Sequence, residues 1–488
     1  MAKLPYGSVV TGLARAEPER AALVCGGETL SRAALEQRAN RLARALAGHG
    51  VGPGDLVTLA LPNSVALVVG CVASWKLGAV PNPISHRLPA PERAKILERA
   101  APRVAIGCEA PAGAASLPAD FAPGDDVADT PLADAASRVP PHERALASGG
   151  STGMPKLILP ANPGVHDDAA PSRLFAARNA MLVPGPLHHA APFSACFQAL
   201  LGGATVVLME RFDAAECLAL VERHRVDRMT VVPTMMLRIW RLPEAERLAR
   251  DVSSLDFVMT GGAPCPAWLM RAFIDWLGPD VMHEAFGPSE RIGGTFITGR
   301  EWLAHPGSVG KPLPGTVLEI RDPETGERLP AGEMGEIWAL PAGGPGSTYR
   351  YVGATGKRSE DGFESVGDMG WLDDDGYLHL GDRRADMILV DGRNVYPAEI
   401  EAALEEHPSV RGACVIGLPD EERGQRIHAL VESDAPLDED ALRAHLAERL
   451  SRYKLPASFE RVREPLRDEA GKVRRHRLRE ARLPAGSR

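Results

Sequence analysis

The sequence predicts an α/β protein with a large N-terminal domain and a small C-terminal domain. Between about residues 204 and 277, strand-length apolar stretches alternate with longer stretches of helical spacing. This alternation is typical of doubly wound, mainly parallel sheets with helices on both faces. Short strands and turns after about residue 305 predict a small β-barrel-like part of the same domain. A second mixture of helices and strands predicts an α+β C-terminal domain, with domains at 1–381 and 382–488.

The individual elements follow from apolar spacing and turn residues. Apolar positions predict a helix over 29–48, a glycine-rich turn leads into a strand over 56–61, and the run 65–75 predicts a buried helix. The segment 110–141 is rich in Ala, Pro and Asp and predicts a surface excursion. The later predicted strands are 205–209, 228–232, 255–259, 410–417 and 427–432. The later predicted helices are 214–224, 234–241, 265–277, 396–407 and 438–450.

Length and composition exclude several classes of protein. A chain of 488 residues is too long for one core, and 44% hydrophobic with 24% charged residues is typical of a globular protein. The net charge of -9 argues against general nucleic-acid binding. The 7 cysteines are scattered without a Cys-x-x-Cys pair, which predicts a reducing, cytoplasmic location. We expect no signal segment and no membrane span.

The stretch 148–156 has the composition of a phosphate-binding loop. Its predicted phosphate-contacting residues are Ser148, Gly149, Gly150, Ser151, Thr152, Gly153 and Lys156. Glycines let backbone N–H groups approach phosphate oxygens, hydroxyls add donors, and a lysine adds charge. Lys156 follows Pro155, so the loop is not a Walker loop, which needs Gly-Lys-Ser/Thr at the start of a helix. From these residues alone, an ordinary surface turn is the alternative.

Four further motifs accompany this loop: Gly261-Gly262-Ala263-Pro264, Phe286-Gly287-Pro288-Ser289-Glu290, Gly367-Asp368 and Gly471-Lys472. With them, the chain resembles the adenylate-forming superfamily of acyl-CoA synthetases, carrier-protein adenylation domains and beetle luciferases. The resemblance extends from Asn40 almost to the end of the chain and is closest to the acyl-CoA synthetases. It implies that a carboxylic acid and MgATP form an acyl-AMP with release of pyrophosphate, and that the acyl group then passes to a second nucleophile, usually a thiol.

The resemblance implies a role for each part of the nucleotide site. The loop 148–156 would hold the β and γ phosphates, Glu290 would hold Mg²⁺, and Ser289 would contact phosphate. Taken alone, Glu290 would be an ordinary surface carboxylate. The nucleoside would contact Gly262, Ala263, Pro264, Glu284, Phe286, Gly287, Asp368 and Arg383. Of these, Glu284 would accept from the adenine amino group, and Asp368 would accept from the ribose hydroxyls. A salt bridge at the hinge is the alternative for Arg383.

Lys472 matches the family's catalytic lysine, which bridges the attacking carboxylate and the α-phosphate. A solvated lysine in a basic tail is the alternative. A hinge at Asp382 would let a mobile C-terminal domain rotate, withdraw Lys472, and bring the loop of Gly392 to the thiol tunnel. An ordinary turn is the alternative for that loop.

The acid is expected to bind near four short segments: 188–193, Met235, 261–263 and 291–293. His189 matches a gating residue, and packing or gating is favoured over metal binding for the pair His188-His189 because no third ligand is near in sequence. No aspartate occupies 188–197, which argues against an amino-acid substrate. The glycines and the aromatic and sulfur side chains of these segments favour an aryl or medium-chain acid.

Some positions depart from the commonest family residues, namely Gly149, Leu157, Phe286 and 467–470. None removes a charge that the chemistry needs. The leading function is an AMP-forming acid:CoA ligase that uses ATP, Mg²⁺ and CoA as a monomer or homodimer. The alternatives are an adenylating enzyme whose acceptor is a carrier protein, an amine or nitrite, and an inactive nucleotide-binding paralogue.

Overall fold

The computed structural model describes residues 3–133, 137–148, 155–167, 174–381, 386–390, 393–420, 423–469 and 471–483. Several predicted site residues lie outside the described residues: Gly149, Gly150, Ser151, Thr152, Gly153, Arg383 and Gly392. The predicted hinge residue Asp382 also lies outside them.

A mainly parallel sheet forms the centre of the N-terminal part, in the order β3-β2-β12-β11-β13-β14-β15. Its strands are β2 (Ala21–Cys25), β3 (Glu28–Ser31), β11 (Ala180–Val183), β12 (Thr205–Leu208), β13 (Arg228–Val231), β14 (Phe257–Gly261) and β15 (Met282–Phe286). All neighbouring pairs among them are parallel except the edge pair β2-β3.

Alternate residues of these strands face two different apolar clusters. Met181 and Val183 pack in one cluster, whereas Leu182 packs in the other. Helices α1 (Tyr6–Ala16), α2 (Arg32–Gly48), α3 (Val65–Lys76) and α5 (Ala190–Leu201) contribute to the first cluster. Helices α6 (Ala214–His224), α7 (Pro233–Trp240) and α9 (Ala267–Leu277) contribute to the second. Because successive side chains of a strand point to opposite faces, the sheet has helices on both faces and is doubly wound.

Smaller sheets flank this centre. A parallel sheet has the order β5-β4-β6-β7, and an antiparallel one has the order β20-β9-β8. Their strands are β4 (Leu56–Leu59), β5 (Val80–Pro83), β6 (Val104–Ile106), β7 (Ala115–Leu117), β8 (Leu146–Ser148), β9 (Lys156–Pro160) and β20 (Tyr349–Val352). The remaining short elements of the N-terminal part are β1 (Leu4–Pro5), β10 (Val165–His166), α4 (Ala90–Ala100), α8 (Glu244–Leu248) and α10 (Gly299–Ala304). Strand β7 lies within 110–141, where the sequence predicted only a surface excursion, because residues 115–117 pair with β6.

Antiparallel strands continue the main sheet beyond β15 and form the part that was predicted to be barrel-like. They are β16 (Thr295–Thr298), β17 (Ser308–Pro312), β18 (Val317–Arg321), β19 (Gly335–Leu340), β21 (Lys357–Arg358), β22 (Glu364–Ser365), β23 (Met369–Leu372) and β24 (Leu378–Leu380). Ile292, Ile320, Ile337 and Leu378 pack in their own apolar cluster.

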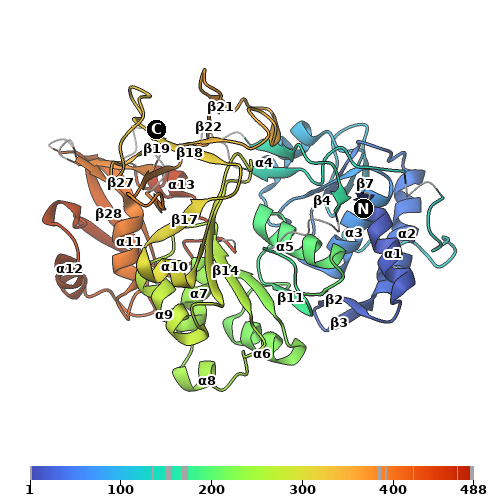
Figure 1. The fold of residues 1–488 in the computed structure, drawn as a ribbon, viewed down its shortest axis with the longest axis horizontal. Helices are drawn as coiled ribbons and strands as arrows, with labels where there is room; N and C mark the ends of the chain where they lie inside the picture. The colour runs from blue at the N-terminus through green and yellow to red at the C-terminus, as the bar shows by residue number, and fades with distance from the viewer. Residues whose placement is uncertain are drawn as a thin grey trace.

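The C-terminal residues form a separate sheet with its own core. Its strands are β25 (Ile388–Val390), β26 (Arg393–Val395), β27 (Gly412–Asp420), β28 (Gly424–Glu432) and β29 (Ser458–Val462), and its helices are α11 (Pro397–Glu405), α12 (Glu439–Ala447) and α13 (Arg475–Glu480). Helices α11 and α12 pack on this sheet through Ile400, Leu404, Leu442 and Leu446. Figure 1 shows these elements at one end of the molecule and α1–α3 at the other.

Several element boundaries differ from the sequence prediction by a few residues, and two of them have a clear structural reason. Helix α2 begins at Arg32, not at 29, because residues 28–31 form β3 and the Ser31 side chain caps the helix by accepting from the Ala34 backbone N–H. Strand β14 spans Phe257–Gly261 because Arg228 pairs with Phe257 and Val231 pairs with Thr260. None of the helices in the described part of the chain combines the length and apolar character needed to cross a membrane.

Candidate active site

The two ends of the predicted phosphate loop lie on paired strands. Ser148 ends β8, and its cross-strand partner Lys156 begins β9. Lys156 therefore begins a strand, whereas the lysine of a Walker loop stands at the start of a helix. The Ser148 hydroxyl oxygen is buried and has no hydrogen-bond partner among the residues that the structure describes. A buried unpaired hydroxyl costs free energy, and donation to a phosphate oxygen would remove that cost.

Lys156 contacts Glu290, so residues of two separate predicted motifs lie side by side in the structure. Lys156 Nζ lies 3.2 Å from Glu290 Oε1 and donates to the Tyr351 hydroxyl at 2.6 Å. That hydroxyl donates to Glu290 Oε1 at 2.5 Å. Burial and the Glu290 carboxylate raise the pKa of Tyr351, so its hydroxyl remains a donor. The side chains are mostly buried, with Lys156 22% and Glu290 8% exposed.

Tyr351 is a site residue that the sequence did not reveal. It lies on β20, where it pairs with Ile158 of β9, so the strand pairing brings it beside Lys156. The Lys156 ammonium also lies 3.9 Å from the centroid of the Tyr351 ring, close enough for a cation–π contact. The alternation of Tyr349 and Tyr351 in the sequence indicates a strand. It does not indicate that this strand lies beside Lys156, because 195 residues separate Tyr351 from Lys156.

Glu290 is suited to a metal that keeps most of its ligands outside the protein. Within the described residues, no group of three or more His, Cys, Asp or Glu side chains could hold a metal ion. Mg²⁺ is usually bound by one or two carboxylates together with substrate phosphates and water. A single buried carboxylate next to a lysine and a phosphate loop fits that pattern.

The predicted adenine residues lie at the carboxyl edges of neighbouring parallel strands. Glu284 of β15 pairs with Thr260 of β14. A Cβ on Gly261 would lie 2.4 Å from the Ala285 carbonyl oxygen, so this close approach needs glycine. Gly262 follows with φ +80. Ligands of open α/β sheets bind at such edges. Burial raises the pKa of the Glu284 carboxyl to about 8, so it is protonated at neutral pH.

The predicted ribose residue lies near the adenine strand. Asp368 and Phe286 line one cavity of about 10 Å³ together with Pro288 and Ile292. Gly367 has φ +84, which allows the turn that presents Asp368. The other predicted contacts flank these groups: Ala263 and Ser289 are half-buried, whereas Gly262, Pro264 and Gly287 are exposed.

The C-terminal hairpin with Lys472 docks against the N-terminal part. A Cβ on Gly471, which has φ +74, would lie 2.9 Å from Thr234 Oγ1. Thr234 lies at the start of α7, directly after β13. The Lys472 charge acts on His188 and His189: burial, His86 and Lys472 lower the pKa of His188 to about 4, and burial, His188 and Lys472 lower the pKa of His189 well below its usual value. Both imidazoles are therefore neutral at neutral pH.

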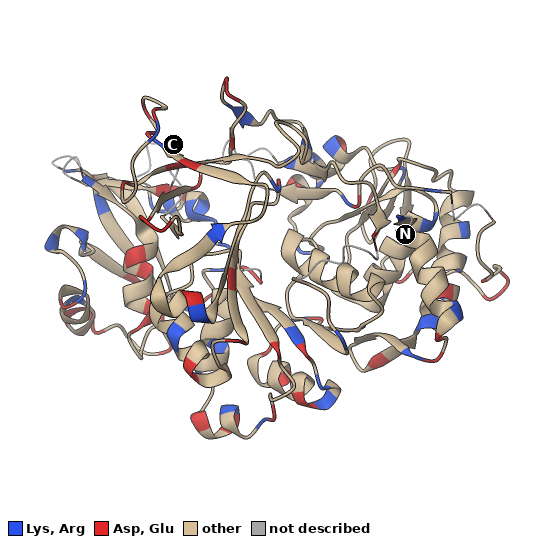
Figure 2. Cartoon of the chain, viewed as in Figure 1, with Lys and Arg blue, Asp and Glu red and all other residues tan. Residues whose placement is uncertain are grey.

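The basic C-terminal tail forms ion pairs with carboxylates of the same chain. Arg467 and Arg475 contact Glu401, and Arg482 contacts Glu460. Arg474 and Arg477 both contact Glu92 of α4, and Glu469 contacts Arg87. In Figure 2, positively charged residues (blue) and negatively charged residues (red) are interspersed along the described part of the chain.

The expected far wall of the acid pocket contains an ion cluster. Arg291 Nη2 lies 2.6 Å from Glu143 Oε1 and 3.5 Å from Ser194 Oγ of α5. The buried Arg144 contacts the same carboxylate. Ile292, which was predicted to line the same wall, packs in the core of the antiparallel strands.

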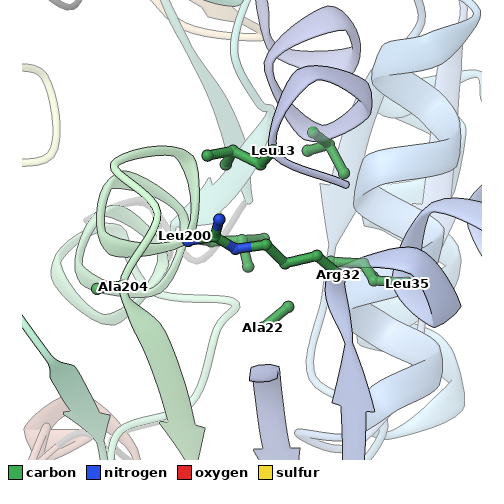
Figure 3. Close-up of a pocket in the computed structure, with 7 residues that line it drawn as sticks. Leu13, Ala22, Arg32, Leu35, Leu200 and Ala204 are labelled. Atoms are coloured by element: carbon green, nitrogen blue, oxygen red, sulfur yellow. The ribbon is translucent and has the colours of Figure 1, made fainter. Parts of the chain in front are cut away.

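A second cavity lies among the N-terminal helices, away from these residues (Figure 3). It is lined by Val10, Leu13, Ala22, Arg32, Leu35, Leu200 and Ala204. Arg32 donates to the Gly203 carbonyl oxygen and pairs with Glu17. At about 10 Å³ the cavity has room for about one water molecule.

A doubly wound sheet with a glycine-rich loop and polar groups at its carboxyl edge is typical of a nucleotide-binding α/β enzyme. Two family models match the chain: AMP-binding enzyme over residues 12–351, and AMP-binding enzyme C-terminal domain over residues 399–472. The chain therefore belongs to the AMP-binding, adenylate-forming enzyme family, which confirms the family predicted from the sequence motifs.

Curated relatives match over nearly their whole length. A 2-succinylbenzoate–CoA ligase of Bacillus licheniformis is 31% identical over 94% of this chain and 97% of its own. A feruloyl-CoA synthase of an Amycolatopsis species is 34% identical over 93% and 94%. A fatty acid–[acyl-carrier-protein] ligase of Streptomyces coeruleorubidus is 32% identical over 96% and 94%.

Solved structures share the fold. The o-succinylbenzoate CoA synthetase of Bacillus subtilis in complex with its acyl-adenylate has a TM-score of 0.78 at 26% identity, covering 99% of both chains. The same enzyme with ATP and a magnesium ion has a TM-score of 0.77 at 25% identity, covering 98% of this chain and 100% of that one. The predicted α/β fold class is confirmed.

Proposed function

We propose that this protein is an AMP-forming acid:CoA ligase that converts a carboxylic acid and MgATP to an acyl-adenylate and pyrophosphate, and then transfers the acyl group to CoA. The observation that carries the proposal is the Lys156–Glu290–Tyr351 cluster at the exit of the glycine loop, together with a lysine hairpin docked at the carboxyl edge of β13. The acid:CoA ligases among the relatives support it.

When MgATP binds, the ion pair between Lys156 and Glu290 would be replaced by two contacts, one of Lys156 with phosphate and one of Glu290 with Mg²⁺. Without substrate, Lys156 and Glu290 neutralise each other. With MgATP, Lys156 and Ser148 would contact phosphate oxygens, and Glu290 would hold Mg²⁺ beside Ser289. Mg²⁺ supplies positive charge that stabilises the leaving pyrophosphate. The loop residues 149–153 are proposed to donate backbone N–H groups to the same phosphates.

The nucleoside end is proposed to use Glu284 and Asp368. A protonated Glu284 carboxyl offers one donor and one acceptor, which matches the amino group and ring nitrogen of adenine. The segment Gly262-Ala263-Pro264 would pack on the adenine face opposite Phe286-Gly287. Asp368 would accept from the ribose hydroxyls, and Arg383 is proposed as a second ribose contact.

Replacing Glu284 with Gln is expected to change the pH dependence of stability. Burial raises the Glu284 pKa from 4.5 to about 8 in the folded protein. As pH rises between these values, the unfolded chain loses a proton that the folded chain keeps, so wild-type stability falls. Glu284→Gln removes this slope and is more stable than wild type at pH 8, on the order of 2–4 kcal/mol, but not at pH 4.

Denaturant unfolding at both pH values measures this difference. A constant stability difference between the two proteins at pH 4 and pH 8 would contradict the assignment. Since Gln keeps one donor and one acceptor, the KM for ATP of Glu284→Gln should stay near that of wild type, whereas Glu284→Leu should raise it ~10-fold or more.

The acid is proposed to be an aryl or medium-chain carboxylic acid. Arg291 directly follows Glu290 in sequence, and its side chain reaches Ser194 of α5. Arg291 and Arg144 both contact the Glu143 carboxylate, so this end of the expected pocket is polar. A charged floor would stop a long aliphatic chain, because its terminal methylenes would displace water from guanidinium groups. His189, neutral at the start of α5, is proposed to gate the pocket.

The acceptor is proposed to be CoA, which the loop of Gly392 would help to bind. A carrier protein is the second candidate, because one close relative is named as a fatty acid–[acyl-carrier-protein] ligase. We place the protein in the cytoplasm, as a monomer or homodimer; its 7 cysteines are unpaired thiols, which supports a reducing compartment.

The deciding experiment measures pyrophosphate release over a panel of aryl, medium-chain and long-chain acids, with and without CoA. A CoA-dependent thioester supports the proposal. An adenylate that forms but is transferred only to a carrier protein, an amine or nitrite supports another acceptor. If no acid releases pyrophosphate, an inactive nucleotide-binding paralogue is the better description.

We further propose that residues 1–381 and 382–488 are domains that rotate about Asp382 between the two half-reactions. The ion pairs of Glu92 with Arg474 and Arg477 cross between these domains, with distances of 2.9 and 2.8 Å. Arg87 and Glu469 form a third cross-domain pair. All three pairs must break if the C-terminal domain rotates.

Glu92→Gln is expected to slow adenylation but not acyl transfer. The Arg474 and Arg477 side chains are 47% and 56% exposed. The loss should therefore be only ~2–5-fold, and high salt should erase it. Pyrophosphate release at 50 mM and 500 mM salt measures the effect. Glu216→Gln, which breaks a surface pair with Arg223 within α6, is the control. Equal slowing in both variants would contradict a cross-domain role.

A further inference from the structure

The hairpin that carries Lys472 is closed by hydrogen bonds between its two arms. The Asp468 backbone N–H donates to the Lys472 carbonyl oxygen at 2.9 Å, and the Lys472 backbone N–H donates to Asp468 Oδ1 at 2.9 Å. Leu466 and Val473, one on each arm, pack in the same small apolar cluster with Leu418 and Leu430. These contacts hold the two arms of the hairpin together. The position of Lys472 then depends on the contacts of Arg467 and Arg475, which lie where the hairpin begins and ends.

One buried carboxylate holds both sides of that base. Glu401 of α11 is only 3% exposed. Its Oε2 accepts from Arg467 Nη2 at 3.0 Å and from Arg475 Nη2 at 3.0 Å, and its Oε1 accepts from Arg475 Nη1 at 2.5 Å. Arg467 precedes Lys472 and Arg475 follows it, so Glu401 ties together the chain before and after the lysine.

We call Glu401 and its two partners, Arg467 and Arg475, the clamp. It extends to Gly471, the residue before Lys472. Arg467 Nη1 donates to the Gly471 carbonyl oxygen at 3.3 Å. On the other side, Glu401 Oε1 accepts from the Val415 backbone N–H at 2.7 Å, which anchors the carboxylate to β27. The chain of contacts thus runs from the sheet through Glu401 and Arg467 to the peptide bond before Lys472.

The ion-pair partners of this network all lie in the C-terminal domain. Glu405 Oε1 lies 3.7 Å from Arg467, and Asp386 Oδ2 lies 3.6 Å from Arg475. The two guanidinium groups therefore have carboxylate partners without any contribution from ATP. Such a network keeps its geometry when the domain leaves the nucleotide, because its partners move with it.

We propose that Glu401 is a positioning residue for adenylation, which acts on Lys472 through Arg467 and Arg475. The inference rests on the proposed function, since it assumes that Lys472 meets the α-phosphate. A displacement of about 1 Å at a reacting group can cost ~10²-fold in rate. In the proposed rotation Lys472 leaves the nucleotide before acyl transfer to CoA, so this second step should not depend on Glu401.

The test separates the two half-reactions in the full-length protein. Glu401→Gln keeps the shape of the side chain but removes its charge, and Arg467→Lys keeps the charge but removes the planar fork. Pyrophosphate release with the best acid of the panel measures adenylation. Thioester formation from the synthetic acyl-adenylate and CoA measures transfer. Glu460→Gln, which breaks an ion pair with Arg482 that does not touch the hairpin, is the matched control.

Glu401→Gln and Arg467→Lys are expected to lower the adenylation kcat ~10²-fold with less than ~3-fold change in KM or in transfer, and Glu460→Gln should change neither step. Equal loss of both half-reactions, or an unchanged adenylation kcat, would overturn the inference. If Glu401→Gln does not fold, Arg467→Lys decides by the same criteria.

Hydrogen exchange gives a readout that is independent of activity. The backbone amides of 466–474 should exchange faster in Glu401→Gln than in Glu460→Gln, while those of β27 remain protected. If the exchange rates of the hairpin amides were unchanged, the claim that Glu401 holds the hairpin would be wrong. If wild type releases no pyrophosphate with any acid, the proposed function fails, and this measurement still decides whether Glu401 holds the hairpin.

Discussion

Lys472→Ala should lower the rate of acyl-adenylate formation by at least ~10³-fold, while thioester formation from supplied acyl-adenylate changes little. The attacking carboxylate and the α-phosphate are both anionic, and a compact ammonium between them offsets their repulsion in the transition state. Gly471 packs against Thr234 at the carboxyl edge of β13, so the hairpin is already docked where such a lysine would act.

Lys454→Ala is the matched control for this prediction. Lys454 lies in the same domain and pairs with Glu399 through two short contacts of 2.7 and 2.6 Å. Its loss should therefore leave adenylation almost unchanged. Pyrophosphate release under single-turnover conditions compares the two variants. Full adenylation activity in Lys472→Ala would show that another group bridges the two anions.

The sequence predicted the centre of the fold well because its strands and helices have distinct periods. The alternation between 204 and 277 appears as β12 to α9 with small shifts at the ends. Strand β7 was missed because residues 115–117 are short and carry only a weak apolar signal. Their pairing with β6 depends on a neighbour that the local sequence does not identify.

The site was predictable only where its residues stand together in short motifs. Lys156 and Glu290 each lie in a recognisable motif, and the structure brings them into contact. Tyr351 lies outside any such motif and reaches the site through strand pairing. Glu401 lies in a helix start that the sequence indicates, but its arginine partners are distant in sequence. The partners of Arg291 were unpredictable for the same reason, since Glu143 is 148 residues away.

Glu290→Gln should raise the Mg²⁺ concentration needed for half-maximal pyrophosphate release and lower kcat/KM for MgATP by ~10²-fold or more. A neutral amide offers Mg²⁺ a carbonyl oxygen but no negative charge. It also leaves Lys156 without its ion partner in the free protein, so part of the loss would come from a disordered phosphate site. Titrating Mg²⁺ at fixed ATP separates weaker metal binding from a slower chemical step.

Tyr351→Phe distinguishes the charge of Glu290 from its orientation. The Tyr351 hydroxyl donates to Glu290 and accepts from Lys156, so its removal leaves both charges in place but removes the group that aligns them. A hydrogen bond to a charged group contributes about 1.5–3 kcal/mol, so a loss of ~10- to 150-fold in kcat/KM is expected with little change in the Mg²⁺ requirement. If Tyr351→Phe shifted the Mg²⁺ requirement as far as Glu290→Gln does, alignment by the hydroxyl, and not the carboxylate charge, would determine metal binding. If neither variant shifted it, Glu290 would not be the metal ligand, and its contact with Lys156 would serve only to hold the phosphate lysine in place.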